Sequence, residues 1–384
     1  MTKPSTETTF DVPQGQLQLY RFPRRKGELL RAWDAGDSYL LQHLHDDDGA
    51  GNGATWIVND SFGALTVALA ASTRPLYMSS DSWLAHEGTR ANLCDNGLAD
   101  SSAHLLDSFV SPSEAIATVL VKIPKSLALL EDQLHRIRLH VRPGVRILGA
   151  GMTKAIHTST LNLFERILGR TSTSRARQKA RLVLCDFDET LDSGSTPYPT
   201  QYRFDGFDQM LCNHAGVFSR ERLDSGTSRL LAQVPAGATA QHIVDLGCGN
   251  GVVGLVAAQR NPAATLTFVD ESFRAVASAE HNWQTLFGNS RSAVFEVGDS
   301  LTPVANGSAD VILCNPPFHQ SNAMGDATAW RMFTGARRAL RSGGTLLIVG
   351  NRHLAYHAKL RRLFGHCEVL HSDSKFVVLC SRSC

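Results

Sequence analysis

The sequence lacks the short patterns that would assign its class at once. No two of its eight cysteines have CxxC spacing, which speaks against a zinc or redox motif. No apolar run is long enough to cross a bilayer, and the first residues lack the apolar stretch of a signal peptide. The histidines have no ligand-like spacing, so we predict no metal. We expect a soluble, cytoplasmic protein with no membrane partner.

The charges are unevenly distributed although the net charge is only +2. Residues 1–121 carry eight Lys/Arg and fifteen Asp/Glu, whereas residues 122–181 carry thirteen Lys/Arg and three acids. Such a basic block is typical of a surface that contacts phosphates, and a solvated face is the alternative. The candidate polyanion contacts within it are Lys122, Lys125, Arg136, Arg138, Arg142, Arg175 and Arg177.

Strand and helix patterns alternate from residue 242 onward. We predict strands at 242–247, 265–270, 292–299, 309–314 and 344–351, helices at 251–260, 275–283, 327–344 and 355–365, and a hairpin over 367–380. Glycines are expected to stop the third helix. Repeated strand–helix units predict a parallel, doubly wound sheet that binds ligands at the carboxyl ends of its strands.

The N-terminal half repeats this order of strands and helices as a degenerate copy. Five of its segments, between residues 55 and 185, match segments of the C-terminal half in the same order. We infer a duplicated α/β fold of two domains, 1–190 and 191–384. A polar segment that begins at Asp186 joins them.

A glycine-rich loop follows the first strand of the C-terminal half. Its sequence, DLGCGNG, contains Asp245, Gly247, Gly249 and Gly251, and glycines permit positive φ and close approach of a ligand. A tight turn without a ligand is the alternative. The pattern D-x-G-x-G-x-G resembles motif I of S-adenosylmethionine (SAM)-dependent methyltransferases. That resemblance implies SAM as cofactor, with Asp270 on the ribose hydroxyls and Asp299 near the adenine amine.

The string CNPPF follows the fourth strand and supplies Asn315, Pro316, Pro317 and Phe318. The string Asn-Pro-Pro-Phe resembles the motif with which SAM-dependent enzymes transfer a methyl group to a planar, conjugated nitrogen. The resemblance implies that the Asn315 side-chain oxygen and the Pro316 carbonyl accept the amine hydrogens. The prolines fix the carbonyl direction by restricting φ, and Phe318 offers a stacking face. A loop turn with a buried Phe is the alternative for this string alone.

Longer stretches of the sequence narrow the choice of methyl acceptor. The segments "NHAGVFSRERLDSGTSRLL" and "VGNRHLAYHAKL", with the degenerate copy in front, resemble the ribosomal RNA large subunit methyltransferase G family. This implies methylation of guanine N2 in 23S ribosomal RNA by the C-terminal one of two tandem Rossmann-like domains, with a degenerate, RNA-binding domain in front. Arg220 and Arg352 are then further candidate RNA contacts, and Asp224 either lines the site or caps a helix.

Other readings stay open on sequence grounds. The small-subunit methyltransferase C family is a close second resemblance, with 16S ribosomal RNA as substrate. A protein glutamine-N5 methyltransferase and a non-catalytic RNA-binding factor are further alternatives. The string from His43 to Gly53 is interpreted as a local insertion of unknown role.

We predict that the N-terminal copy binds no SAM. In the sequence alignment of the two halves, Leu65 stands for Gly251 and Asp81 for Asp270, and Ile123 stands for Asn315. The loop and the amide acceptor are therefore both missing from that copy.

Overall fold

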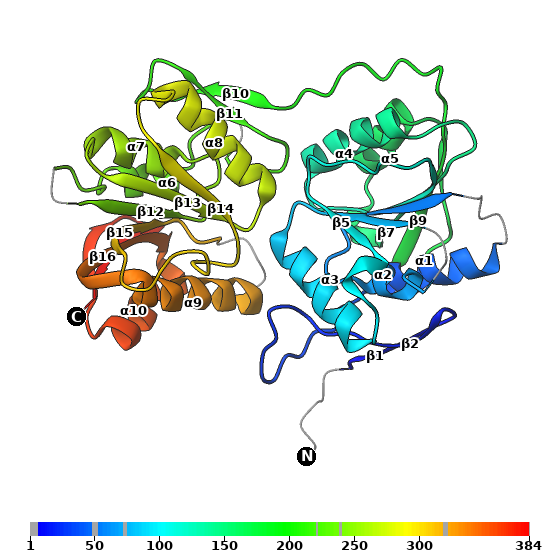
Figure 1. Ribbon diagram of the computed structural model, residues 1–384, viewed down its shortest axis with the longest axis horizontal. Coiled ribbons are helices and arrows are strands. Elements are labelled where there is room, and N and C mark those ends of the chain that lie inside the picture. The colour runs from blue at the N-terminus through cyan, green and yellow to red at the C-terminus, as the bar shows by residue number, and fades with distance from the viewer. Residues whose placement is uncertain are drawn as a thin grey trace. The chain divides into compact units, whose positions relative to one another are not determined.

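Each half of the chain folds around its own seven-stranded sheet (Figure 1). The computed structural model describes residues 7–47, 53–71, 75–219, 222–237, 240–317 and 322–383, with side chains of the last range described from residue 326. The chain divides into an N-terminal unit, Met1–Pro197, and a C-terminal unit, Tyr198–Cys384. This division falls within the polar segment that begins at Asp186. None of the described helices has the length and apolar character needed to span a membrane.

The C-terminal unit alternates strands and helices as the sequence predicts. Its strands are β10 (Thr200–Arg203), β11 (Met210–Asn213), β12 (His242–Leu246), β13 (Thr265–Asp270), β14 (Ala293–Val297), β15 (Ala309–Cys314), β16 (Leu340–Asn351), β17 (Glu368–Ser372) and β18 (Phe376–Arg382). Its α-helices are α6 (Ser225–Leu231), α7 (Val252–Arg260), α8 (Phe273–Phe287), α9 (Asn322–Ala339) and α10 (Tyr356–Phe364). The sheet order is β14-β13-β12-β15-β16-β18-β17, and only β18 runs antiparallel to its neighbours.

Both faces of this sheet are covered, which explains why its central strands are continuously apolar. Successive strand residues point to opposite faces, so Ile243 packs with α6, α7 and α8, and Val244 packs with α9 and α10. Parallel strands all end at one edge of the sheet. The loops after β12, β13 and β15 therefore meet there, as the sequence predicts for a ligand site.

Several predicted boundaries differ from the observed ones, and two of them bear on the glycines and on Asp299. The helix α9 ends at Ala339, before the glycines, because Leu340 already pairs with Ala309 in the sheet. Gly343 then turns the chain at φ 77° within β16 instead of capping the helix. The strand β14 ends at Val297, so Asp299 lies in the loop beyond it.

The N-terminal unit has the same topology, which confirms the predicted duplication. Its strands are β1 (Thr9–Val12), β2 (Gly15–Gln18), β3 (Ala54–Val58), β4 (Leu76–Ser79), β5 (His104–Leu106), β6 (Ile116–Lys122), β7 (Arg146–Met152), β8 (Thr171–Thr173) and β9 (Ala180–Asp186). Its α-helices are α1 (Ala35–Asp46), α2 (Ala64–Leu69), α3 (Trp83–Asp95), α4 (Leu127–His140) and α5 (Thr158–Ile167). The sheet order β5-β4-β3-β6-β7-β9-β8 matches that of the C-terminal unit strand for strand.

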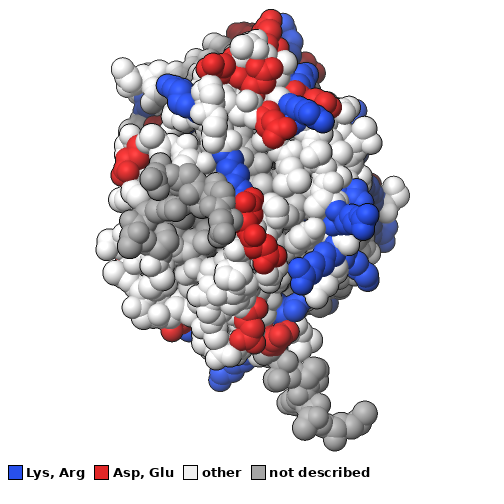
Figure 2. Space-filling view, turned by 90° about the vertical axis from the view of Figure 1, so that its right-hand side faces the viewer, with Lys and Arg blue, Asp and Glu red and all other residues white. Residues whose placement is uncertain are grey.

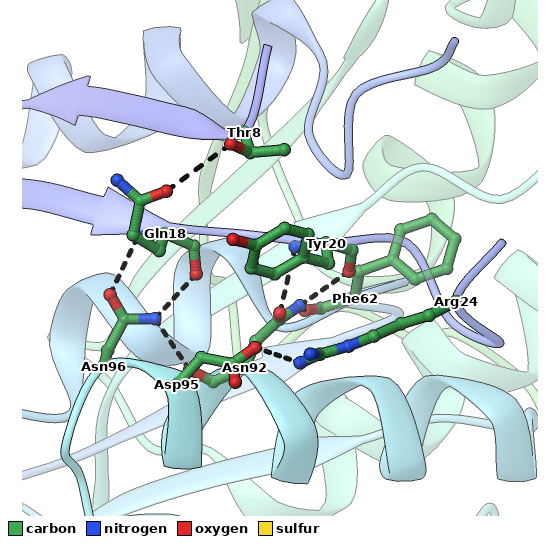
Figure 3. Close-up of polar contacts among 8 residues, drawn as sticks. All are labelled: Thr8, Gln18, Tyr20, Arg24, Phe62, Asn92, Asp95 and Asn96. Carbon is green, nitrogen blue, oxygen red and sulfur yellow. Dashed lines mark hydrogen bonds and ion pairs between the residues drawn. The ribbon is translucent and has the colours of Figure 1, made fainter. Parts of the chain in front are cut away.

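A short hairpin precedes each sheet and is held by asparagine side chains. Figure 3 shows these contacts in the N-terminal unit. On α3, Asn92 accepts the N–H of Tyr20 at 3.0 Å and donates to its carbonyl at 2.9 Å. Asn96 holds Gln18 in the same two-sided way, at 2.9 and 2.8 Å. Each amide thus bonds backbone groups that the pairing of β1 with β2 leaves without a partner. Arg24 adds an ion pair to Asp95.

The C-terminal unit repeats this arrangement at Asn282 on α8. Its side chain accepts the N–H of Cys212 at 2.7 Å and donates to that residue's carbonyl at 2.9 Å. It also donates to the carbonyl of Asn250 in the glycine loop at 2.9 Å. Asn92 likewise donates to the carbonyl of Phe62. The duplication therefore includes the entry hairpins, which the sequence alignment of the two halves did not reveal.

Replacing Asn282 with Ala is expected to destabilise the C-terminal unit. The substitution leaves the buried groups of Cys212 and Asn250 without partners, at about 1–3 kcal/mol for each group. Thermal unfolding of the full chain measures the loss. The matched control is Gln284→Ala, an exposed position on the same helix, which should change stability by less than about 0.5 kcal/mol. Equal melting of the two variants would contradict the anchoring role.

Candidate active site

The glycine loop turns the chain from β12 into α7 through three residues in the left-handed region. Gly247, Gly249 and Gly251 have φ values of 71°, 54° and 82°. A Cβ added at Gly251 would lie 2.9 Å from the Cβ of Ala279, so the glycine there is required by packing. A Cβ at Gly249 would meet no described atom within 4 Å. That side of the loop is open and fits the close approach of a ligand.

Two carboxyl groups hold this loop and the helix start that follows it. Asp270, at the end of β13, accepts the N–H groups of Gly249 and Ser272, both at 3.0 Å. Asp245 lies beneath the loop, 2% exposed, and accepts the N–H of Gly254 at 2.7 Å. Burial raises the pKa of both carboxyl groups, that of Asp245 to about 8, because the charged form loses its hydration. The loop N–H groups oppose this shift. Both residues thus keep the loop in the shape that a cofactor would meet.

The Asn-Pro-Pro corner lies beside the glycine loop. A Cβ at Gly247 would be 4.0 Å from the backbone carbonyl oxygen of Asn315. Asn315 directly follows β15, and its Nδ2 donates to Oγ1 of Thr227 at 2.8 Å. Its Oδ1 is buried and has no hydrogen-bond partner among the described residues. A buried acceptor without a partner is costly, and here it is available to a ligand that brings a donor.

Other residues predicted for the site lie as follows. Pro316 is buried and Pro317 exposed, while Phe318 and Arg220 lie outside the described residues. Asp299 is paired with Arg331 of α9, whose Nε lies 3.1 Å from Oδ2. It lines a cavity of about 500 Å³ together with Trp330 and Thr334. The role of Asp299 near an adenine stays a prediction.

Sequence reasoning missed Thr227. Asp224 caps α6, and its Oδ2 accepts the N–H of Thr227 at 3.0 Å, as the helix-cap alternative for Asp224 foresaw. Thr227 is the third residue of this helix. The cap fixes the start of the helix beside the Asn-Pro-Pro corner, where Thr227 contacts Asn315. A serine or threonine three residues after a capping Asp was the available signal. The partner of Thr227, however, lies 88 residues away.

The N-terminal unit has a different polar group at the equivalent corner. Lys122 ends β6, and its Nζ lies 2.8 Å from Asp34 and 2.6 Å from Asp37, both on Oδ1. Asp34 caps α1 and Asp37 is its third residue, the places that Asp224 and Thr227 hold in α6. Lys122 therefore corresponds to Asn315. The assignment of Lys122 to an RNA-binding surface is wrong, because its ammonium is buried and ion-paired.

Local geometry corrects further positions in the alignment of the two halves. Gly63, at φ 79°, precedes α2 as Gly251 precedes α7, so Leu65 does not replace Gly251. The Oγ of Ser80 accepts the N–H of Ser82, as Asp270 accepts that of Ser272. Ser80, not Asp81, thus corresponds to Asp270.

The cations of the basic block lie at opposite edges of the N-terminal sheet. Near the carboxyl ends of β6 and β7 are five exposed cations, here called the edge cations: Lys125, Lys154, Arg175, Arg177 and Lys179. No ion pair joins any of them to a described acid. Near the other edge, Arg166 pairs with Glu131, and Arg138 donates to four backbone carbonyls between Ile167 and Leu191.

The remaining candidate RNA contacts differ in exposure. Arg136 is half-buried, and Arg142 is exposed near the edge opposite the edge cations. Arg352 is exposed in a short turn after β16, where its NH1 donates to the carbonyl of Asp373 at 3.1 Å. On the face of the molecule that Figure 2 shows, Lys and Arg gather along one side, and Asp and Glu form separate groups.

Comparison with known proteins agrees with this geometry. Residues 7–189 match the model described as RLMG N-terminal domain, and residues 208–380 match the methyltransferase small domain. The solved T. thermophilus 16S rRNA N2 methyltransferase RsmC, in complex with AdoMet and guanosine, superposes with a TM-score of 0.76. That structure is 22% identical and covers 98% of both chains, so it shows the fold. The fold and the site together define a class I SAM-dependent methyltransferase.

Sequence relatives narrow this class further. A protein of Streptomyces avermitilis named ribosomal RNA large subunit methyltransferase G is 52% identical over 96% of this chain and 97% of its own length. A protein of the same name from Pseudomonas paraeruginosa is 45% identical over 96% of this chain and 98% of its own. The chain belongs to the ribosomal RNA large subunit methyltransferase G family.

The residues present fit the cofactor of this class. The open side of Gly249 admits a ligand to the backbone, and Asp270 lies directly under the loop. SAM, when bound, supplies a methyl group on a positively charged sulfur.

Replacing Lys122 with Met is expected to destabilise the N-terminal unit by about 3 kcal/mol or more, because two carboxylates then lose their shared cation. Burial raises the pKa of Asp37 to about 6, so this carboxylate depends on the ammonium at neutral pH. Calorimetric melting measures the loss. Lys125→Met, at an exposed position, is the control, and adding Asp34→Asn and Asp37→Asn should recover part of the stability. Unchanged melting of Lys122→Met would contradict the stabilising role of the ion pairs among Lys122, Asp34 and Asp37.

Proposed function

We propose that the C-terminal unit transfers a methyl group from SAM to the exocyclic N2 of a guanine in 23S ribosomal RNA. The observation that carries the proposal is the buried, unpartnered Oδ1 of Asn315 beside the glycine loop. The names of the family members support large-subunit ribosomal RNA as the substrate, and guanine N2 is the acceptor of the structurally similar RsmC.

The geometry suits an aromatic amine. Such an amine is a poor nucleophile because its lone pair is delocalised into the ring. Two acceptors that draw its hydrogens turn the lone pair out of that plane, and we assign this role to Asn315 Oδ1 and the Pro316 carbonyl. No strong base is needed at the corner, and orientation of the amine provides most of the rate. The guanine has to leave its stack to reach this edge, as base-modifying enzymes generally require.

Asn315→Ala is expected to abolish methyl transfer while SAM affinity stays within a few-fold. The variant removes the acceptor and leaves Gly247, Gly249 and Asp270 intact. Transfer of labelled methyl groups to 23S ribosomal RNA and calorimetric SAM binding give the two readouts. Asp270→Ala is the opposite control, and it should weaken SAM binding because the Gly249 N–H loses its partner. An Asn315→Ala variant with wild-type turnover would rule out the amine-orienting role.

The same assay separates the alternative acceptors. Methylation of 16S instead of 23S ribosomal RNA, or of a glutamine in protein, would refute the proposed acceptor. Absence of SAM binding would favour a non-catalytic RNA-binding factor.

The N-terminal unit is proposed to hold the RNA through the edge cations. They are exposed and lack acidic partners in the described chain, so their charge is available to phosphates. Arg138 is engaged by backbone carbonyls and Arg142 lies near the opposite edge, so we place neither in this surface. Arg136 and Arg352 remain weaker candidates.

Neutralising Lys125, Arg175 and Arg177 together is expected to weaken RNA binding and to flatten its salt dependence. Each lost phosphate contact should reduce the log–log slope by about 0.7–0.9. RNA affinity measured across a salt series tests this. The matched control neutralises Arg142, Arg166 and Arg170 at the opposite edge of the same sheet. An equal loss in both triple variants would show that only net charge matters, and SAM affinity should be unchanged in each.

A further inference from the structure

We propose that Thr227 is a positioning residue that holds the Asn315 amide with its oxygen available to the substrate amine. This inference rests on the proposed function, because it assumes that Asn315 Oδ1 accepts a hydrogen from the amine. A primary amide has an acceptor at one end and two donors at the other. Only one of its two orientations can serve an amine that also has to donate.

The hydroxyl of Thr227 holds the amide in that orientation. A hydroxyl can serve either end of an amide, so the substrate amine excludes the flipped amide and Thr227 partners Nδ2 of the productive one. The hydroxyl lies 2.8 Å from Nδ2 and accepts its hydrogen, and Thr227 is 6% exposed. With Nδ2 held in this way, the amide carries its oxygen on the other side, where no described residue donates to it. The flipped amide would present an NH2 group to the substrate amine, so two donors would face each other and neither could bond.

The local structure fixes the hydroxyl itself. Thr227 is the third residue of α6, and its own N–H is held by the capping carboxylate of Asp224 at 3.0 Å. Gly226 precedes it against Phe376, whose ring a Cβ at Gly226 would approach to 3.1 Å. The helix start therefore cannot shift toward Phe376 without a clash.

The N-terminal unit shows independently that this helix position reaches the corner. There the third residue of α1, Asp37, lies 2.6 Å from Lys122, which stands at the place of Asn315. The contact between helix and strand end is preserved, but its chemistry differs. In the N-terminal unit both partners are charged, and the ammonium is ion-paired with two carboxylates. In the C-terminal unit both are neutral, and one acceptor is left over for a substrate.

The test is Thr227→Val, which removes the hydroxyl at nearly constant volume. We expect kcat to fall roughly ten- to a hundred-fold, the effect of losing one hydrogen bond that orients a catalytic group. SAM affinity and RNA affinity should stay within about twofold of wild type, since Thr227 contacts neither loop glycine. Thr227→Ser should recover most of the lost rate because it restores the hydroxyl. The matched control is Ser225→Ala, an exposed hydroxyl two residues earlier on the same helix.

The outcomes separate this inference from the function on which it rests. If Asn315→Ala is inactive and Thr227→Val is as active as wild type, the positioning role is refuted and the proposed function stands. If Asn315→Ala is active, the proposed function itself fails. A Thr227→Val variant that loses SAM affinity and melting temperature together, without rescue by Ser, would assign Thr227 a packing role and overturn the inference.

Discussion

In both halves of this protein, the start of one helix contacts the polar residue at the carboxyl end of a central strand. The helix is α1 or α6, and the strand is β6 or β15. That strand end is buried, so any polar group placed there needs a partner from the helix above it. In the C-terminal unit Asn315 and Thr227 satisfy each other with one hydrogen bond and leave an oxygen free. In the N-terminal unit Lys122 is bonded to two carboxylates of the capped helix. The same geometry gives an open site in one copy and a filled one in the other.

The shape of the glycine loop depends on carboxyl groups that bond to the protein backbone. Asp245 and Asp270 accept backbone N–H groups of the loop and of the helix starts around it. Burial raises the pKa of both because their hydration is lost. In the N-terminal unit Asp60 fulfils the same need from a different position, since its carboxylate accepts the N–H of Thr66 at 2.8 Å. A carboxylate therefore holds the turn in both copies, although the glycine patterns of the two loops differ.

The duplication accounts for features that neither half explains alone. The asparagines on α3 and α8 anchor equivalent entry hairpins, so the two copies share the device that holds this segment to the sheet. The two copies share their strand order but differ in the charged residues at their surfaces. The edge cations surround the carboxyl ends of the N-terminal strands, the same edge of the fold at which the C-terminal unit forms its site. The N-terminal copy thus presents cations at the edge where the C-terminal copy has its candidate site.

Local sequence determined the parallel sheet, its order of elements, the glycine loop and the Asn-Pro-Pro corner, because each depends on neighbouring residues: apolar runs, glycines at positive φ, and prolines that stop a strand. Burial and partners depended on residues far apart in the chain. Lys122 was predicted as a surface cation since its charge is visible in the sequence, but its two carboxylates lie more than 80 residues away. Thr227 was overlooked because nothing local to it indicates Asn315. The pairing of distant groups across the sheet edge, fixed only when helix and strand pack, decided which polar residues are satisfied and which remain open to a ligand.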